Sequence, residues 1–303
     1  MSRGHWQQQR EHGNVHGILF LVWVCRHLGR RAVHAVLIFP CLFFFIFAAR
    51  ARQASRQYLA NALGKKPSAG QVFWHIYTFG RISVDRFFFL MRKADKFELH
   101  CEGAEIFEEI LAHHTGALFF LSHVGNFDAL REVGIENSDC KIRLLLDSEI
   151  TPNAMQVFRT LSSELAQNII DRRQYDGPAL ALKLNDELLQ GNMIGIMVDR
   201  IYGEERSIPL SFFGKRAHFP IGPWQLAQVL KVPVVLCFGL YCGGNKYLLK
   251  FTRLPDFKQV ARGERESQLE NEMRLYVQQL EETLRLQPYN WMNFYPFWID
   301  ASA

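Results

Sequence analysis

Short apolar runs alternate with amphipathic stretches along the middle of the chain, and this alternation constrains the fold more than any other feature. Strands are predicted at residues 97–101, 118–121, 142–146, 168–170, 193–198 and 232–241, with helices at 102–114, 152–166 and 178–190 between them. Repeated strand and helix segments are typical of an α/β fold with a largely parallel sheet flanked by helices. Ligands bind beyond the carboxyl ends of the strands in such sheets, so polar residues at those ends are candidate site residues.

The strand at 118–121 is followed by His123 and, five residues later, by Asp128. Gly125 permits a tight turn and Asn126 is a good helix cap, so the Asp128 carboxylate is expected to fold back onto the His123 ring and orient it. A histidine held by a carboxylate can remove a proton from a hydroxyl group. The pair alone also fits a structural role, with a partly buried histidine near a helix start that favours an acidic residue.

Two further polar groups follow predicted strands of the same sheet. Arg172 and Arg173 come after the strand at 168–170, and Asp199 and Arg200 come after the strand at 193–198. Because parallel strands end at one edge of a sheet, these groups are expected to converge with His123. We predict that they bind substrate together with Arg131, although salt bridges on helix surfaces would explain the arginines equally well.

The N-terminal 66 residues combine apolar runs with positive charge. Ten basic residues stand against Glu11 alone there, whereas the rest of the chain carries a net charge of −4. Basic charge confined to an apolar end favours an anionic membrane surface over nucleic acid as the partner. Residues 1–56 are predicted to anchor the protein to a membrane and residues 57–303 to form the catalytic domain.

The topology of this anchor stays open. The apolar run at 18–25 is too short to span a bilayer, and the 18 residues from 32 to 49 would reach about 27 Å as a helix against a hydrocarbon core of about 30 Å. Pro40 interrupts the longer run, and basic residues flank it on both sides. A single span, an interfacial hairpin and a buried core helix are the alternatives, and the excess of basic residues after the run favours a cytoplasmic body.

The absence of several common motifs reduces the number of reaction types that the chain could catalyse. The six cysteines form no C-x-x-C and no zinc-like cluster with histidine, so no metal site is predicted. The chain also lacks the G-x-S-x-G, H-E-x-x-H and P-loop patterns. In the remaining segments we expect helices at 50–64, 71–91, 220–231 and 263–286, a loop at 201–218, a hairpin into a strand at 247–252, and an aromatic cluster at 289–298.

Several of these residues resemble a known family. His123-Val-Gly-Asn-Phe-Asp128 looks like the H-x4-D box of the lysophospholipid acyltransferase superfamily, and the chain is most similar to its lipid A late (lauroyl/myristoyl) acyltransferase branch. The further motifs that carry the resemblance are Asp171-Arg172-Arg173, Asp199-Arg200-Ile-Tyr202-Gly203, Phe212-Phe-Gly214, Val232-Pro-Val-Val235 and Pro288-Tyr-Asn-Trp291. Within the branch, the tail resembles the predicted acyltransferases of aryl polyene-type lipid pathways. Lipid A enzymes usually have Glu in place of Asp128 and Gln in place of Arg200, which puts lipid A as the acceptor in question.

The resemblance implies a membrane-associated acyltransferase at the cytoplasmic face of a bacterial inner membrane. An acyl thioester of acyl carrier protein or coenzyme A would be the donor, with no bound cofactor, and a lipid hydroxyl or amine the acceptor. His123 would be the base oriented by Asp128, and amides near Gly125 with Arg200 or Arg173 would stabilise the oxyanion. A catalytically silent lipid- or carrier-binding protein and a lipid hydrolase are alternatives. Acyl chain, acceptor, donor and oligomeric state stay open.

Overall fold

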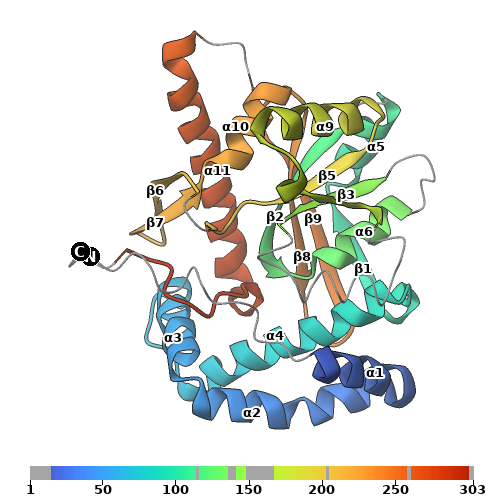
Figure 1. The fold of residues 1–303 in the computed structure, drawn as a ribbon. Coiled ribbons are helices and arrows are strands. Elements are labelled where there is room, and N and C mark those ends of the chain that lie inside the picture. Colours follow the sequence, from blue (N-terminus) through green and yellow to red (C-terminus); the bar gives the residue numbers. More distant parts are fainter. Residues whose placement is uncertain are drawn as a thin grey trace.

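A seven-stranded sheet forms the centre of the protein (Figure 1). The computed structural model describes residues 15–113, 116–135, 141–147, 167–202, 205–257 and 261–299. The strands are β1 (Glu98–Glu102), β2 (Ala117–Gly125), β3 (Ile142–Leu146), β4 (Ile169–Asp171), β5 (Met193–Met197), β8 (Val234–Tyr241) and β9 (Lys246–Arg253), in the spatial order β1-β9-β8-β2-β5-β3-β4. All neighbours are parallel except β8 and β9, which confirms the predicted α/β class.

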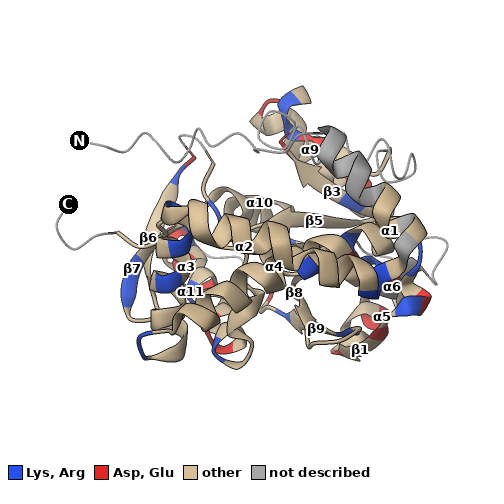
Figure 2. Cartoon of the chain, turned by 90° about the horizontal axis from the view of Figure 1, so that it is seen from below, with Lys and Arg blue, Asp and Glu red and all other residues tan. Residues whose placement is uncertain are grey.

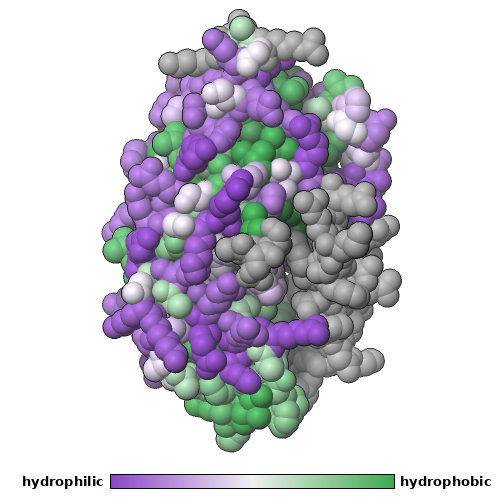
Figure 3. Space-filling model, turned by 90° about the vertical axis from the view of Figure 1, so that its left-hand side faces the viewer, coloured by the Kyte–Doolittle hydropathy of each residue, from purple (hydrophilic) through white to green (hydrophobic). Residues whose placement is uncertain are grey.

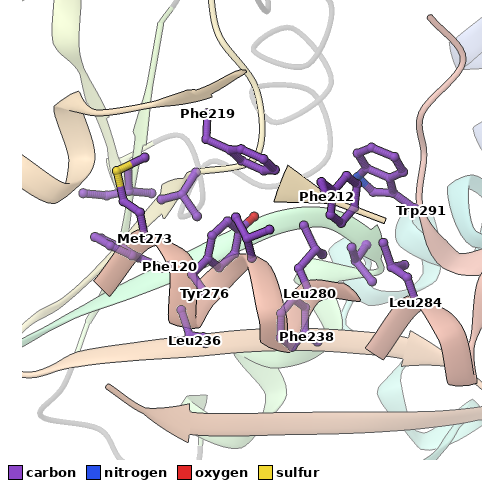
Figure 4. Packing of buried hydrophobic residues seen from close by; sticks show 14 of the residues in the cluster. Phe120, Phe212, Phe219, Leu236, Phe238, Met273, Tyr276, Leu280, Leu284 and Trp291 are labelled. Atoms are coloured by element: carbon purple, nitrogen blue, oxygen red, sulfur yellow. The ribbon is translucent and has the colours of Figure 1, made fainter. Parts of the chain in front are cut away.

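Helices cover both faces of the sheet. They include α5 (Ala104–Ala112), α6 (Phe127–Ile135), α9 (Gly177–Leu189), α10 (Gly222–Leu230) and α11 (Arg265–Leu286). Side chains alternate across a strand, so Leu118 and Phe120 of β2 enter the core shared with α9, α10 and α11, whereas Phe119 and Leu121 enter the core shared with α5 and α6. Figure 4 shows part of the first core, with Phe120 of β2 and Tyr276 of α11 among its labelled residues. In this core the Phe120 ring also meets Trp224 edge to face at a centroid distance of 4.8 Å. Burial on both faces explains why β2 reads as a continuous apolar run.

The prediction of a loop at 201–218 is wrong over most of that range. Ser207–Phe212 (β6) and Lys215–Pro220 (β7) form an antiparallel hairpin. Phe213 and Gly214 make its two-residue turn with φ of 51° and 73°, the left-handed conformations that such turns require. Leu210 and Phe212 are buried on one side of the hairpin. The charged and proline residues among the other positions made this alternation of buried and exposed residues hard to recognise in the sequence.

The remaining predictions agree with the described elements within a few residues, and the helix predicted at 152–166 lies outside the described residues. The N-terminal part forms α1 (Val15–Val36), α2 (Ile38–Phe47) and α3 (Ala49–Leu63), which precede α4 (Ala69–Leu90). Gly29 has non-helical angles and bends α1 between the two predicted apolar runs. Figure 1 shows α1 and α2 lying along α4 at one end of the sheet.

Close approach of β2 and β8 determines the backbone path just beyond His123. Gly125 has φ +61°, and its Cβ, if present, would overlap the carbonyl oxygen of Gly239. The adjacent Asn126 amide donates a hydrogen bond to the same oxygen at 2.7 Å. The pairing register of the two strands shifts between Leu121 and Gly125 at this point. Glycine is therefore required at position 125 by conformation and by space.

We expect Gly125→Ala to destabilise the protein by about 3 kcal/mol or more, because the new methyl group meets backbone atoms that cannot move aside. Thermal unfolding followed by circular dichroism measures the effect. Gly177→Ala is the matched control, because no atom lies within 4 Å of its Cβ position. The control should change stability by less than about 0.5 kcal/mol. Equal melting temperatures for both variants would contradict the close approach of the two strands.

Candidate active site

His123 is held by the carboxylate of Asp199. The Nδ1 atom lies 2.8 Å from Asp199 Oδ1, and the backbone N–H of His123 donates to Asp199 Oδ2 at 3.0 Å. The indole of Trp291 donates to the same Oδ2 atom at 3.1 Å. Asp199 follows β5, the strand directly beside β2, so the two side chains meet at the carboxyl ends of neighbouring parallel strands. The predicted convergence of His123 and Asp199 is therefore correct.

Asp199 is fully buried and ionised. Burial alone would raise the pKa of its carboxyl group, but the contacts with His123, Arg200 and Trp291 lower it to about 2. An ionised carboxylate accepts hydrogen bonds only, so Nδ1 of His123 must carry the proton that joins them. The other ring nitrogen, Nε2, then has a free lone pair in the neutral imidazole.

The environment of His123 keeps the ring neutral at neutral pH. Burial lowers the pKa of His123, and the charge of Arg200 lowers it further, while Asp199 opposes both effects. The side chain is still 23% exposed, so a substrate atom can approach it. Nε2 lies 3.5 Å from the Tyr202 hydroxyl, too long for a strong hydrogen bond. These features suit a general base that accepts a proton at Nε2.

The predicted contact between Asp128 and His123 is not formed, and this expectation was wrong. Asp128 Oδ2 accepts from Arg86 Nε at 2.5 Å, and among the described residues Oδ1 has no hydrogen-bond partner. The reason is that β2 stays extended through Gly125, beyond the predicted strand end, before Asn126 caps α6. Asp199 already occupies the Nδ1 atom of His123. A catalytic role for Asp128 stays a prediction.

Arg200 lies beside the His123–Asp199 pair. Its Nη2 atom donates to the backbone oxygen of Met292, and its guanidinium stands 5.3 Å from the ring centre of Tyr295. The Nε atom is buried and has no hydrogen-bond partner among the described residues. Burial raises the pKa of Tyr202 to about 12 and also raises that of Tyr295, so both tyrosines are neutral. A permanent positive charge next to the base can stabilise developing negative charge on a substrate.

Arg172 and Arg173 lie at the same edge of the sheet but pair with Asp147 after β3. Arg173 Nε is 2.9 Å from Asp147 Oδ2, and Arg172 Nε is 3.7 Å from it. Both side chains are about half exposed, and β4, which precedes them, is separated from β2 by β5 and β3. Arg172 also acts on half-buried Glu205, whose pKa is raised by burial although this arginine opposes the rise. The two arginines therefore form an outer part of the predicted site.

The other predicted site residues lie around β2. Arg131 is on α6, where it opposes the rise that burial causes in the pKa of Glu132. Gly125 is explained by its packing on Gly239, and an oxyanion role for its neighbouring amides stays a prediction. Gly203 lies outside the described residues. Among the described residues, no group of three or more His, Cys, Asp or Glu side chains is placed to bind a metal ion.

The C-terminal segment 289–298 supplies the residues that sequence reasoning missed. Besides the indole contact with Asp199, the Met292 amide donates to the carbonyl oxygen of His123 at 2.8 Å. The Trp291 carbonyl lies 2.7 Å from Nε2 of buried His75, whose Nδ1 lies 2.8 Å from Ser55 Oγ. Burial lowers the pKa of His75 to about 4, so this neutral ring donates to Trp291 and accepts from Ser55. The aromatic cluster was visible in the sequence, but no spacing pattern connects an indole with a distant carboxylate.

A comparison with protein families bears on this site. The family model described as bacterial lipid A biosynthesis acyltransferase matches residues 10–299, which include every site residue described above. No curated protein matches the chain. The match covers nearly the whole sequence and supports an acyltransferase that acts on lipids.

Two substitutions should move the pKa of His123 in opposite directions. Asp199→Asn removes the negative charge that favours the imidazolium and should lower the pKa, whereas Arg200→Met removes the opposing positive charge and should raise it. Titration of the labelled histidine ring by NMR measures both shifts. Circular dichroism must first show that each variant is folded. Shifts in the same direction would contradict the electrostatic arrangement described here.

Proposed function

Because the chain belongs to the bacterial lipid A biosynthesis acyltransferase family, we propose that it moves an acyl chain from a thioester to a hydroxyl or amine of a lipid acceptor, with His123 as general base. The observation that carries the proposal is the His123–Asp199 pair, which leaves Nε2 available as a proton acceptor at neutral pH. Acyl carrier protein or coenzyme A would present the thioester.

The proposed reaction needs one base and no covalent enzyme intermediate. His123 Nε2 takes the proton of the acceptor hydroxyl or amine while the acceptor atom attacks the thioester carbonyl carbon. The tetrahedral intermediate then expels the thiolate, which takes the proton from the imidazolium. Ionised Asp199 stabilises the imidazolium between these steps, and Arg200 is the proposed partner of the oxyanion. General base catalysis of this kind contributes a factor of about 10² to 10⁴.

The residue beside His123 supports direct transfer over a covalent route. Ser122 precedes the base, but its hydroxyl lies on the opposite face of β2, buried, 2.9 Å from the Tyr276 hydroxyl of α11. Buried Cys237 in neighbouring β8 has a pKa well above its ordinary value, which makes its thiol a poor nucleophile. The acceptor itself is therefore the proposed nucleophile.

The acceptor is proposed to be a membrane lipid, with the body on the cytoplasmic side of a bacterial inner membrane. Arg200 supports an acceptor that differs from lipid A, because it places a permanent charge where the resembling enzymes usually have a neutral glutamine. An aryl polyene-type lipid, another glycolipid or an aminolipid are the candidates. Lipid mass spectrometry of cells with and without the gene would identify acyl group and acceptor together.

A hydrolase would use the same base with water as the acceptor, and a silent binding protein would need neither His123 nor Asp199. Product analysis with an acyl thioester, with and without the lipid acceptor, separates these functions. Free fatty acid as the sole product would favour the hydrolase. Vesicle binding without any turnover would favour the binding protein.

We expect His123→Ala and Asp199→Asn to lower kcat for acyl transfer by about 10² to 10⁴, because both remove the oriented base. In wild-type protein, activity should fall on the acid side at a pH below the ordinary histidine pKa, since the pKa of His123 is lowered by burial and by Arg200. In Asp199→Asn this acid limb should move to still lower pH.

Asp128→Asn is the comparison that tests the other carboxylate. Since Asp128 pairs with Arg86, its substitution should lower the melting temperature without moving the acid limb as Asp199→Asn does. If Asp128→Asn displaces the pH profile and Asp199→Asn does not, the orienting role belongs to Asp128.

A further inference from the structure

One face of the N-terminal helices is apolar and exposed. We define the apolar face as the exposed large hydrophobic residues of α1, α2 and α4. They are Trp23, Val36, Ile38, Phe39, Leu42, Phe43, Phe44, Ile46, Phe47, Trp74 and Phe79. Phe39 and Phe47 are 73% and 68% exposed, values that are costly for a phenylalanine in water. Figure 2 shows α2 as an uncharged helix on this side, and the lower end of Figure 3 is correspondingly hydrophobic.

The helix that carries this face is also the one candidate for crossing a membrane among the described residues. Residues 29–47 qualify by length and composition. After the bend at Gly29, the helix continues through Leu37 into α2 with little interruption, since the amides of Leu37 and Cys41 keep helical hydrogen bonds. To cross a membrane, residues 29–47 would have to separate from the rest of the protein along their whole length.

Buried polar contacts hold this helix against the body. Arg30 forms two hydrogen bonds with the fully buried Asp85 carboxylate, at 2.5 and 2.6 Å, and His34 Nε2 lies 3.1 Å from the same group. Tyr247 of β9 donates to Asp85 as well, at 2.8 Å, and Tyr77 donates to the carbonyl oxygen of His34 at 2.8 Å. Removing the helix would leave the Asp85 charge without its arginine in the protein interior, which is strongly unfavourable.

Close packing continues beyond the charged end. A Cβ at Gly80 would lie 2.9 Å from Leu37 Cδ2 and 3.0 Å from Cys41 Sγ, so this helix and α4 are in direct contact there. At the far end, Arg52 donates to the carbonyl oxygens of Phe45 and Ile46. The helix is therefore attached to the body at both ends and in the middle, with its outward side left apolar.

The charge around the apolar face is positive. No Asp or Glu occurs between residues 12 and 84, and the first acidic residue after this range is buried Asp85. Arg31 of α1 and Arg50 and Arg56 of α3 are exposed. Apolar side chains edged by arginines match a bilayer with anionic headgroups, whereas an acidic protein surface would not satisfy the exposed phenylalanines.

We propose that the apolar face lies flat in one leaflet of an anionic bilayer and that residues 29–47 do not cross it. All four helices α1–α4 stay on the side of the catalytic body in this arrangement. The membrane contact is then made by α2 and the adjoining edges of α1 and α4 rather than by a transmembrane anchor.

The apolar face also adjoins the active-site wall. Phe294 contacts Phe44 and Phe79 with ring-centre distances of 6.5 and 5.2 Å, and stacks on His75 at 4.7 Å. Phe294 belongs to the C-terminal segment whose Trp291 binds Asp199. If the proposed function holds, this contact places the apolar face beside the segment that binds Asp199, the partner of His123.

Vesicle flotation with the full chain tests the membrane contact. Phe39→Ser, Phe43→Ser and Phe47→Ser together should weaken binding to vesicles of equimolar phosphatidylglycerol and phosphatidylcholine by more than about 100-fold. The matched control replaces Leu189, Leu286 and Val229 by Ser. These residues are equally exposed but lie on α9, α11 and α10, and the control should bind as wild type does.

Unchanged binding of the phenylalanine variant would overturn the proposal, as would wild-type protein that forms a dimer through this face in solution and ignores vesicles. Circular dichroism spectra that match those of the wild-type protein would show that the variant and the control are both folded. His123→Ala should bind vesicles fully, so loss of acyl transfer and loss of membrane contact are separate results. Failure of the proposed function leaves this binding test intact.

Chemical labelling distinguishes a flat helix from a crossing one. Arg31→Cys and Arg50→Cys stand near the two ends of the 29–47 segment. A membrane-impermeant maleimide added to sealed, inverted inner-membrane vesicles should modify both engineered cysteines from the same side. Peptide mass spectrometry identifies the modified residue, so the natural cysteines stay in place. If one of the two sites reacts only after detergent opens the vesicles, the segment crosses the membrane and the proposal fails.

Discussion

The contacts of the ionised Asp199 carboxylate are the interactions on which the carboxyl ends of β2 and β5 depend. The carboxylate lies in a fully buried position, where a charge is tolerated only if hydrogen bonds replace water. Three donors do this: the ring and amide of His123 and the indole of Trp291. Because these donors come from β2 and from the C-terminal segment, burial of one charge requires β2, β5 and the tail to be assembled together.

The N-terminal helices are connected to Asp199 by the same network of hydrogen bonds. Trp291, which donates to Asp199 through its indole, accepts from His75 of α4 through its carbonyl, and His75 in turn contacts Ser55 of α3. Burial lowers the pKa of His75 to about 4, so this ring is neutral at neutral pH. A segment that composition marked as an anchor is therefore also linked by hydrogen bonds to the His123–Asp199 pair. Another buried carboxylate, Asp85, holds α1 to the body through Arg30.

Sequence patterns predicted the α/β class, most element positions and the meeting of His123 with Asp199 and Arg200, because apolar runs and strand ends follow from local composition. They could not predict which of the two carboxylates, Asp128 or Asp199, would contact the His123 ring. Strand β5 is the neighbour of β2 although β3 and β4 intervene in the sequence, and this order depends on packing across the whole sheet. The short spacing to Asp128 therefore suggested the wrong carboxylate. The β6–β7 hairpin was missed because only one side of it is buried.

Burial and Arg200 explain how His123 stays neutral beside a carboxylate, as the proposed base role requires. Asp199 alone would raise the pKa of His123, and an imidazole protonated at neutral pH cannot accept another proton. Burial and the adjacent guanidinium act in the opposite sense and keep the ring neutral. The same positive charge contributes to lowering the pKa of Asp199 and so keeps the carboxylate ionised. An arginine at this position therefore has two electrostatic functions that a neutral glutamine would not supply, before any contact with substrate is made.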